Sequence, residues 1–271
     1  SYRGAAGVIA VTTKKGRSQA FQISYDGTVG FESVFKRIDM LNASQFRKAA
    51  DALRLNYIDM GYDTDFTKSI DRTGFVQNHH IAFGGGSESA NYRASIGMMD
   101  HRTILRNNNY KNYIAKLDIS QKAFDDHLTV DLGMVGSLQQ NDVLPFKQKL
   151  LFSAEVFNPT YPDGANANGS YDQVPEAIWC NNPNSLLAMQ NDETYSHFNI
   201  HMSAVINLAK NLKLKGFGSY SYASIDNAHY YPTFVWSHGE AYRRDSKRVE
   251  RAGHGGSDGR EGGDEGDSSD S

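Results

Sequence analysis

Apolar and polar residues alternate with a period of two through much of this chain. Between residues 21 and 31, the apolar positions are Phe21, Ile23, Tyr25, Val29 and Phe31, and mostly polar residues lie between them. Successive side chains of a β-strand point to opposite faces, so this pattern indicates a strand whose faces meet different surroundings. The pattern predicts seven strands, at 22–30, 76–83, 90–99, 110–120, 127–138, 196–208 and 212–224.

The links between these predicted strands alternate in length. Three are short (84–89, 121–126 and 209–211), two are long (31–75 and 139–195), and 100–109 is intermediate. In an up-and-down meander all short links lie at one rim and all long links at the other, as in transmembrane β-barrels. We therefore predict an all-β fold, in which an open antiparallel meander of about seven strands is part of a large transmembrane β-barrel.

The long links contain local signals of their own. Asn42-Ala43-Ser44-Gln45 is typical of a helix start, and apolar residues follow it with helical spacing. We expect a short helix at about 43–55, in the first outer loop. The Gly-, Pro- and Asn-containing stretch 158–170 predicts an irregular loop.

The two ends of the chain differ from its middle. Residues 7–13 form a β-branched run typical of a buried strand, and Lys14-Lys15-Gly16 ends it. From 245 to 271 the chain is mostly Gly, Ser, Asp, Glu and Arg, which predicts a disordered, low-complexity tail unlike the rest of the chain. The chain begins at Ser1 without a signal peptide, so we expect its start to be a cut within a longer protein.

Composition excludes several functional classes. The net charge of −3 comes mainly from the tail, so no basic domain suggests nucleic-acid binding. The mean hydropathy is −0.56, and no apolar run is long enough for a membrane-spanning helix. A single cysteine, Cys180, excludes an internal disulfide framework and a multi-cysteine zinc site.

No set of residues has the spacing that a catalytic or metal site requires. Gly84-Gly85-Gly86 lacks both phosphate-loop spacings and is best interpreted as a hairpin turn. His197 and His201 would lie on one face of a strand, about 13 Å apart, which is too far for one metal ion. We predict no enzyme activity, no cofactor and no metal site.

Aromatic residues in the predicted outer loops are the candidates for substrate or partner contact. They are Tyr161, Tyr171, Trp179, Tyr230, Tyr231 and Trp236. Tyr and Trp faces can stack on sugars, but the same residues can form an aromatic girdle at the membrane interface or pack the loops. The sequence leaves these alternatives open.

Several segments, in their order along the chain, resemble the SusC/RagA-type TonB-dependent outer-membrane transporters. Residues 1–16 resemble the end of that family's plug domain, and Ile23–Gly27 with Asp39–Asn42 resemble its first barrel strand and loop. Gln77–His79, Gly84-Gly85 and Asn91–Ser95 resemble the next hairpin. Asn158–Gly164 resembles a large outer loop.

The resemblance implies a plugged barrel of roughly 22 strands in the outer membrane of Bacteroidetes-type bacteria. It also implies three regions: the end of the plug at 1–18, barrel strands and loops at 19–244, and the tail at 245–271. The family imports oligosaccharides or peptides with energy from the TonB complex, usually with a SusD-like surface lipoprotein as partner. This chain lacks the family's TonB box, its leading domain and most of the plug. The alternative is a soluble β-sandwich carbohydrate-binding module, which the segregated links disfavour.

Overall fold

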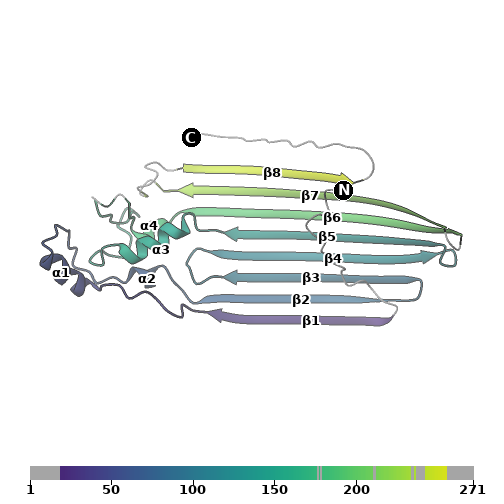
Figure 1. The fold of residues 1–271 in the computed structure, drawn as a ribbon, viewed down its shortest axis with the longest axis horizontal. Coiled ribbons are helices and arrows are strands. Elements are labelled where there is room, and N and C mark those ends of the chain that lie inside the picture. The colour runs from purple at the N-terminus through teal and green to yellow at the C-terminus, as the bar shows by residue number, and fades with distance from the viewer. Residues whose placement is uncertain are drawn as a thin grey trace.

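One antiparallel sheet dominates the structure, a computed structural model that describes residues 19–175, 177, 179–209, 212–232, 235 and 242–254. Its strands lie side by side in chain order (Figure 1). They are β1 (Gln19–Glu32), β2 (Gly74–Gly86), β3 (Ala90–Arg102), β4 (Asn109–Ala123), β5 (Leu128–Asp142), β6 (Gln190–Ala209), β7 (Leu212–Tyr231) and β8 (Tyr242–His254). The predicted meander is confirmed, with all seven predicted strands and one more.

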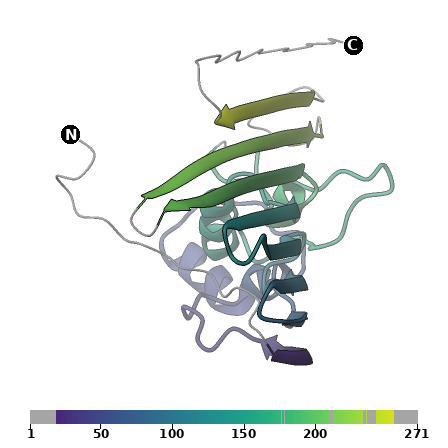
Figure 2. The same cartoon turned by 90° about the vertical axis from the view of Figure 1, so that its right-hand side faces the viewer.

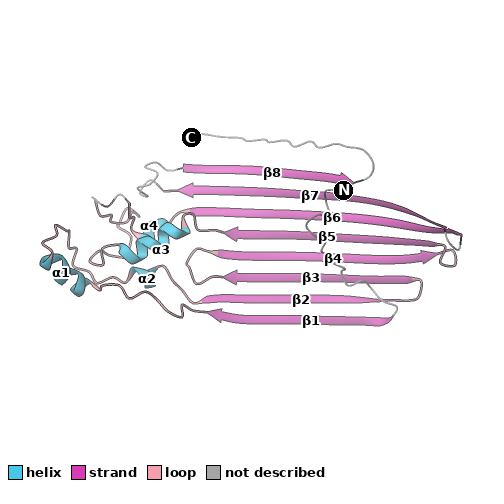
Figure 3. Cartoon of the chain, viewed as in Figure 1, coloured by secondary structure: helices cyan, strands magenta, loops and turns pink. Residues whose placement is uncertain are grey.

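The sheet is open. Seen from the end with the short links, the strands follow a curved line from β1 to β8, and these two edge strands lie far apart (Figure 2). The long links and all four helices of the described residues lie together at the opposite end (Figure 3). Short and long links are therefore segregated to two rims, as the link lengths predicted.

Each predicted strand extends further than expected at its long-link end. For example, β5 continues through Gln140-Asn141-Asp142, and β6 begins at Gln190, before Asp192 and Glu193. Alternation marks a strand only where its two faces meet different media. At this rim both faces carry polar residues. The strand therefore continues there without the alternation that would identify it in the sequence.

The register gives the sheet one apolar and one polar face, because directly paired residues point to the same side. Leu117 of β4 pairs with Met134 of β5, which pairs with Ile200 of β6. Ile96 lies on the same face and is 63% exposed. No second layer of the described residues covers this face, so its apolar side chains remain available for contact with hydrocarbon.

The opposite face is polar. Its residues include Ser24, Asn78, Arg93, Lys116, Asp131 and His201. Glycines on this face let long side chains cross a neighbouring strand. Glu32 of β1 lies beside Gly74 of β2, and its carboxylate is 2.9 Å from Nε2 of His101 on β3.

Four short helices lie in the long links. They are α1 (Ala43–Ala52), α2 (Phe66–Ser69), α3 (Lys147–Val156) and α4 (Pro183–Leu187). The predicted helix at 43–55 is confirmed as α1, and 158–170 forms an irregular loop as expected. Helices α2, α3 and α4 were not predicted. None of these four helices has the length and apolar character needed to cross a membrane.

The eighth strand overlaps the segment expected to be disordered. Strand β8 pairs with β7 from Tyr231↔Tyr242 to Ser219↔His254, so the expected boundary at 244 falls inside it. Its sequence, YRRDSKRVERAGH, lacks the alternation that identified the other strands. The plug-like residues 1–18 and the remaining tail residues 255–271 lie outside the described residues.

An arginine on the apolar face should weaken membrane insertion. Leu117→Arg places a cation where the neighbours are Ala94 and Met134, at a cost of about 2–4 kcal/mol if this point lies near the bilayer midplane. Ser137→Arg, on the polar face of β5, is the matched control. We expect only Leu117→Arg to lower the fraction of protein that refolds into lipid vesicles. Equal losses for both variants would contradict the assignment of faces.

Candidate functional site

The long links pack into a compact cluster at one end of the sheet. Its buried core is made by residues from four links and helices: Phe66, Ile70, Leu105, Leu144, Leu150, Ala154, Phe157, Tyr161, Cys180, Leu186, Leu187, Met189 and Val235. All of these residues lie between the strands rather than within them. The molecule therefore has its hydrophobic core in its loops, while the sheet has an uncovered apolar face.

The cluster lies on the polar side of the sheet. Tyr231, on the polar face of β7, packs against the cluster core, and Tyr110, on the polar face of β4, lines a groove beneath it. If the sheet is part of a barrel wall, these loops partly cover the mouth of the lumen.

Local hydrogen bonds explain where most of the helices begin. The Asn42 side chain accepts a hydrogen bond from the Gln45 backbone N–H, and the Gln45 side chain accepts one from the Asn42 backbone, which is a complete capping box. Asp65 caps α2, and Asn182 with Pro183 begins α4. Helix α3 has no side-chain cap, and its N-cap residue, Phe146, is left-handed (φ 52°).

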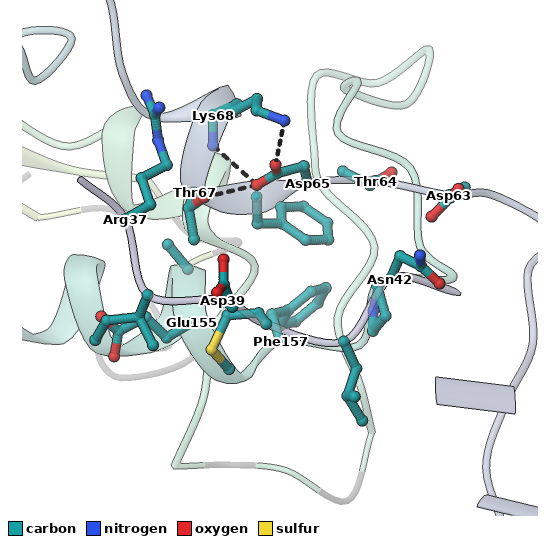
Figure 4. Close-up of a pocket in the computed structure, with 16 residues that line it drawn as sticks. Arg37, Asp39, Asn42, Asp63, Thr64, Asp65, Thr67, Lys68, Glu155 and Phe157 are labelled. Carbon is teal, nitrogen blue, oxygen red and sulfur yellow. Dashed lines mark hydrogen bonds and ion pairs between the residues drawn. The ribbon is translucent and has the colours of Figure 1, made fainter. Parts of the chain in front are cut away.

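A cavity of about 450 Å³, here called the loop-end cavity, opens among these links (Figure 4). The segment between β1 and α1, helix α2 and the end of α3 line it. Its charged residues are Arg37, Asp39, Asp63, Asp65, Lys68 and Glu155, and Phe66 and Phe157 supply aromatic surface.

The cations of the loop-end cavity already have partners. Arg37 is 2.7 Å from Asp71, and Lys68 Nζ is 2.8 Å from Asp65. Partial burial opposes ionisation of Asp65, but hydrogen bonds from Lys68 and Thr67 outweigh it and hold its pKa below the ordinary value. Within the described residues, no hydrogen bond or ion pair reaches the carboxylates of Asp39 and Glu155. The cavity is therefore acidic and can accept hydrogen bonds.

An apolar groove of about 470 Å³ lies on the other side of the same extended segment. Its lining includes Val34, Ile38, Ile70, Ile104 and Leu151, and it shares Arg37, Ile38 and Glu155 with the loop-end cavity. An acidic cavity and an apolar groove thus adjoin at the mouth of the sheet. This arrangement can bind a ligand with both polar and apolar parts.

An exposed ion pair holds the segment that follows α1. Arg47 donates to Asp59 through Nε at 2.6 Å, and the backbone N–H of Gly61 donates to the same carboxylate at 2.8 Å. The hydrogen bond from Arg47, with that from Gly61, lowers the pKa of Asp59 to about 2. The carboxylate therefore stays ionised, and keeps this contact, until the pH falls to about that value.

The six predicted contact aromatics do not share one environment. Tyr161 is only 2% exposed and packs edge-to-face on Phe157, with ring centroids 5.4 Å apart. It contributes to the loop core, as in the alternative in which these aromatic residues pack the loops. Trp179 is 58% exposed and lies 6.0 Å from the ring of Phe152, while Tyr171 is half-buried.

Consecutive tyrosines at the end of β7 point to opposite faces. Tyr230, on the apolar face, is 42% exposed at the long-link rim, which is where an interfacial girdle would lie. Tyr231, on the polar face, packs against the loop core, with its ring centroid 6.2 Å from that of Phe146. Trp236 lies outside the described residues.

The sequence analysis did not identify the charged residues of the loop-end cavity. A signal was present, because Asp59, Asp63 and Asp65 follow one another closely in the first long link. Acidic residues in a loop are usually solvated, however, and only the packing of α2 against α3 brings this segment to Glu155. Spacing along the chain could not have shown that proximity.

Known proteins show which family combines this sheet with these loops. No protein-family model matches the chain. The TonB-dependent receptor SusC of Bacteroides thetaiotaomicron is 30% identical over 222 residues, which cover 72% of this chain. TonB-dependent receptor P3 of Formosa agariphila is 33% identical over 111 residues, or 41% of this chain.

Solved structures agree on the fold. The RagAB peptide importer in its closed-closed state matches 89% of this chain with a TM-score of 0.66 and 17% identity. Its open-open state matches 92% with a TM-score of 0.65 and 20% identity. The chain belongs to the SusC/RagA-type TonB-dependent receptors. This family resides in the outer membrane and is non-enzymatic, so both of these predictions are confirmed.

The chain spans only part of these SusC/RagA-type relatives. It covers 22% of SusC, 11% of P3 and 33–34% of the matched chains of the RagAB structures. The sheet matches part of the RagA barrel. What the complete protein transports, and with which partners, is therefore a matter for proposal.

Leu150 and Leu151 form a matched pair for testing the loop core. Leu150 is 0% exposed, whereas its neighbour Leu151 is 43% exposed. Removing a buried leucine side chain costs about 2–5 kcal/mol, so Leu150→Ala should loosen the cluster and Leu151→Ala should not. Limited proteolysis of the 143–189 link would measure this. Equal cleavage rates for the two variants would contradict the assignment of Leu150 to the core.

Proposed function

We propose that this chain forms the first part of the wall, and several outer loops, of a TonB-dependent importer of oligosaccharides or peptides. The two-faced sheet carries the proposal. One face presents an uncovered apolar surface and the other a polar surface, which is what a wall between lipid and an aqueous lumen requires. The loop cluster at the polar side then lies where a ligand would enter.

In this proposal residues 1–18 are the end of the plug domain, and strands β1 to β8 form part of a larger barrel. The loop-end cavity and the apolar groove would make early contacts with the nutrient. Exposed Trp179 remains a candidate for stacking on a sugar or contacting a partner, whereas buried Tyr161 would support the loops from below.

The proposed partner at the loop end is a SusD-like surface lipoprotein, and the proposed energy source is the TonB complex. The solved RagAB structures, which are described as a peptide importer, support a partner and the peptide alternative by analogy of fold. The outer loops also expose apolar side chains that a partner could cover, among them Phe35, Ile38 and Leu41.

A soluble β-sandwich carbohydrate-binding module requires a second sheet over the apolar face. The described residues form a single sheet with that face uncovered. A sandwich would bury residues such as Ile96, which is instead exposed.

The chain should depend on a membrane-like environment. Both edges of the sheet and its apolar face would otherwise promote association between copies. We expect aggregation in aqueous buffer and a dispersed species only with detergent, as measured by size-exclusion chromatography. A well-behaved monomer without detergent would contradict the proposal of a barrel wall.

Deleting the gene that encodes this chain should identify the nutrient class. Because import through such a receptor is selective, we expect loss of growth on either oligosaccharides or peptides as the sole nutrient, with normal growth on monosaccharides and free amino acids. Complementation with the intact gene is the control. Unchanged growth on every oligosaccharide and peptide mixture tested would argue against an importer.

A further inference from the structure

A polar pocket opens on the apolar face of the sheet, at the rim with the long links. This site, here called the rim pocket, has a volume of about 220 Å³ and is formed by strands β4, β5 and β6. The register places its side chains on the same face as Leu117, Met134 and Ile200, which points outward to lipid. Its lining includes Asn109, Lys111, Gln140, Asp142, Asp192 and Thr194.

The height of the rim pocket matches the headgroup layer of a membrane. On β5, the outward residues from Leu138 to Leu128 are all apolar or glycine, and Gln140 and Asp142 follow at the rim. This apolar stretch is about 34 Å long along the strand, which gives about 25 Å of height at a tilt of about 45°. The apolar band of a transmembrane barrel is about 25 Å tall. The rim pocket therefore lies just outside the hydrocarbon.

The other parts of a barrel would leave the rim pocket uncovered. Strands β4 to β6 lie inside the sheet, away from its edge strands β1 and β8 (Figure 1). Further strands would pair at those edges, and a plug would occupy the lumen on the polar face. Both leave the outward face of β4 to β6 in contact with the membrane.

Two carboxylates face each other at the outer end of the rim pocket. Asp142 and Asp192 are direct cross-strand partners, and like charges in this arrangement repel each other. The Asn109 amide donates to Asp142 at 2.7 Å, and Arg72 donates to the oxygen of that amide at 2.6 Å. Within the described residues, no other hydrogen bond or ion pair reaches either carboxylate. The pair can therefore accept hydrogen bonds from a cationic group.

Lys111 lies between this carboxylate pair and the apolar residues below. It is paired with Gln140, which is two residues closer to the membrane centre than Asp142, a step of about 7 Å along the strand. No hydrogen bond or ion pair with another described residue reaches the Lys111 ammonium. From the rim inward, the pocket thus presents two anions, then a cation, and then an apolar surface.

We propose that the rim pocket binds a membrane lipid with a phosphoethanolamine headgroup. The phosphate of this headgroup is nearer the acyl chains and lies at Lys111. The ammonium is further out and donates charge-assisted hydrogen bonds to Asp142 and Asp192. The acyl chains then follow the apolar face past Tyr113 and Leu138, which are direct partners.

Charge and hydrogen bonding both select this headgroup. A purely anionic headgroup would meet two carboxylates and a single lysine. A choline headgroup carries the same charges as phosphoethanolamine, but its ammonium has no N–H to donate. The inference concerns the outward face of the sheet and is independent of the nutrient that the protein imports.

The test counts the lipids bound to the full chain in detergent micelles by native mass spectrometry. Phosphatidylethanolamine, phosphatidylcholine and phosphatidylglycerol with identical acyl chains are added at equal concentrations. We expect several-fold more phosphatidylethanolamine to bind than either of the other two lipids.

Asp192→Asn and Lys111→Gln should each weaken phosphatidylethanolamine binding about tenfold, the loss expected for one hydrogen bond to a charged group. Lys111→Arg keeps the charge and should retain binding. The matched controls are Asp118→Asn and Lys116→Gln, because Asp118 and Lys116 lie on β4 but on the polar face. Circular dichroism checks that each variant keeps the sheet.

Equal binding of phosphatidylethanolamine and phosphatidylcholine would overturn the inference, and so would a preference for phosphatidylglycerol or the absence of bound lipid. Equal losses for Lys111→Gln and Lys116→Gln would also contradict it. The comparison of the three lipids uses the unaltered chain, so it tests the inference even where a substitution disturbs folding.

Discussion

The pairing of backbone groups within a single sheet with two unlike faces is the constraint on which this structure depends. Hydrocarbon cannot satisfy a backbone N–H or C=O group, so a strand that crosses a membrane must pair with neighbours on both sides. Each strand must also send alternate side chains to lipid and to water. Together these requirements produce the period of two, the continuous meander from β1 to β8, and the placement of all long links at one rim.

The hydrophobic core accordingly lies in the loops and not on the sheet. In a soluble β protein, strand residues such as Leu117 and Ile200 would form the core. Here they face outward, and residues from the links, including Phe66, Leu150 and Leu186, are the buried ones. The loop-end cavity is therefore held by packed helices, whereas the polar face is held by the register of the sheet itself.

Much of the fold could be predicted because its signals are local. Alternation located seven strands, and the Asn42–Gln45 capping box located α1. Helix α3 could not be found in this way, because its apolar residues are spread around the helix and it begins without a side-chain cap. The strand ends at the loop rim were missed because both faces there are polar. Strand β8 was missed because its sequence does not alternate.

The sites were harder to predict, since they depend on contacts between distant segments. Tyr161 was chosen for its residue type and loop position, but packing against Phe157 buries it. Likewise, Gly133 pairs with His201, and only the structure shows that a Cβ at Gly133 would collide with the His201 ring.

The contact between Glu32 and His101 has a mechanical consequence. It joins two strands that are not neighbours, passing over Gly74 on the strand between them. If that middle strand slid by one residue, a side chain would replace the glycine and block the crossing. The contact therefore fixes the register of the three strands at this rim. Here the backbone hydrogen bonds are most accessible to water, and the strands would otherwise begin to separate.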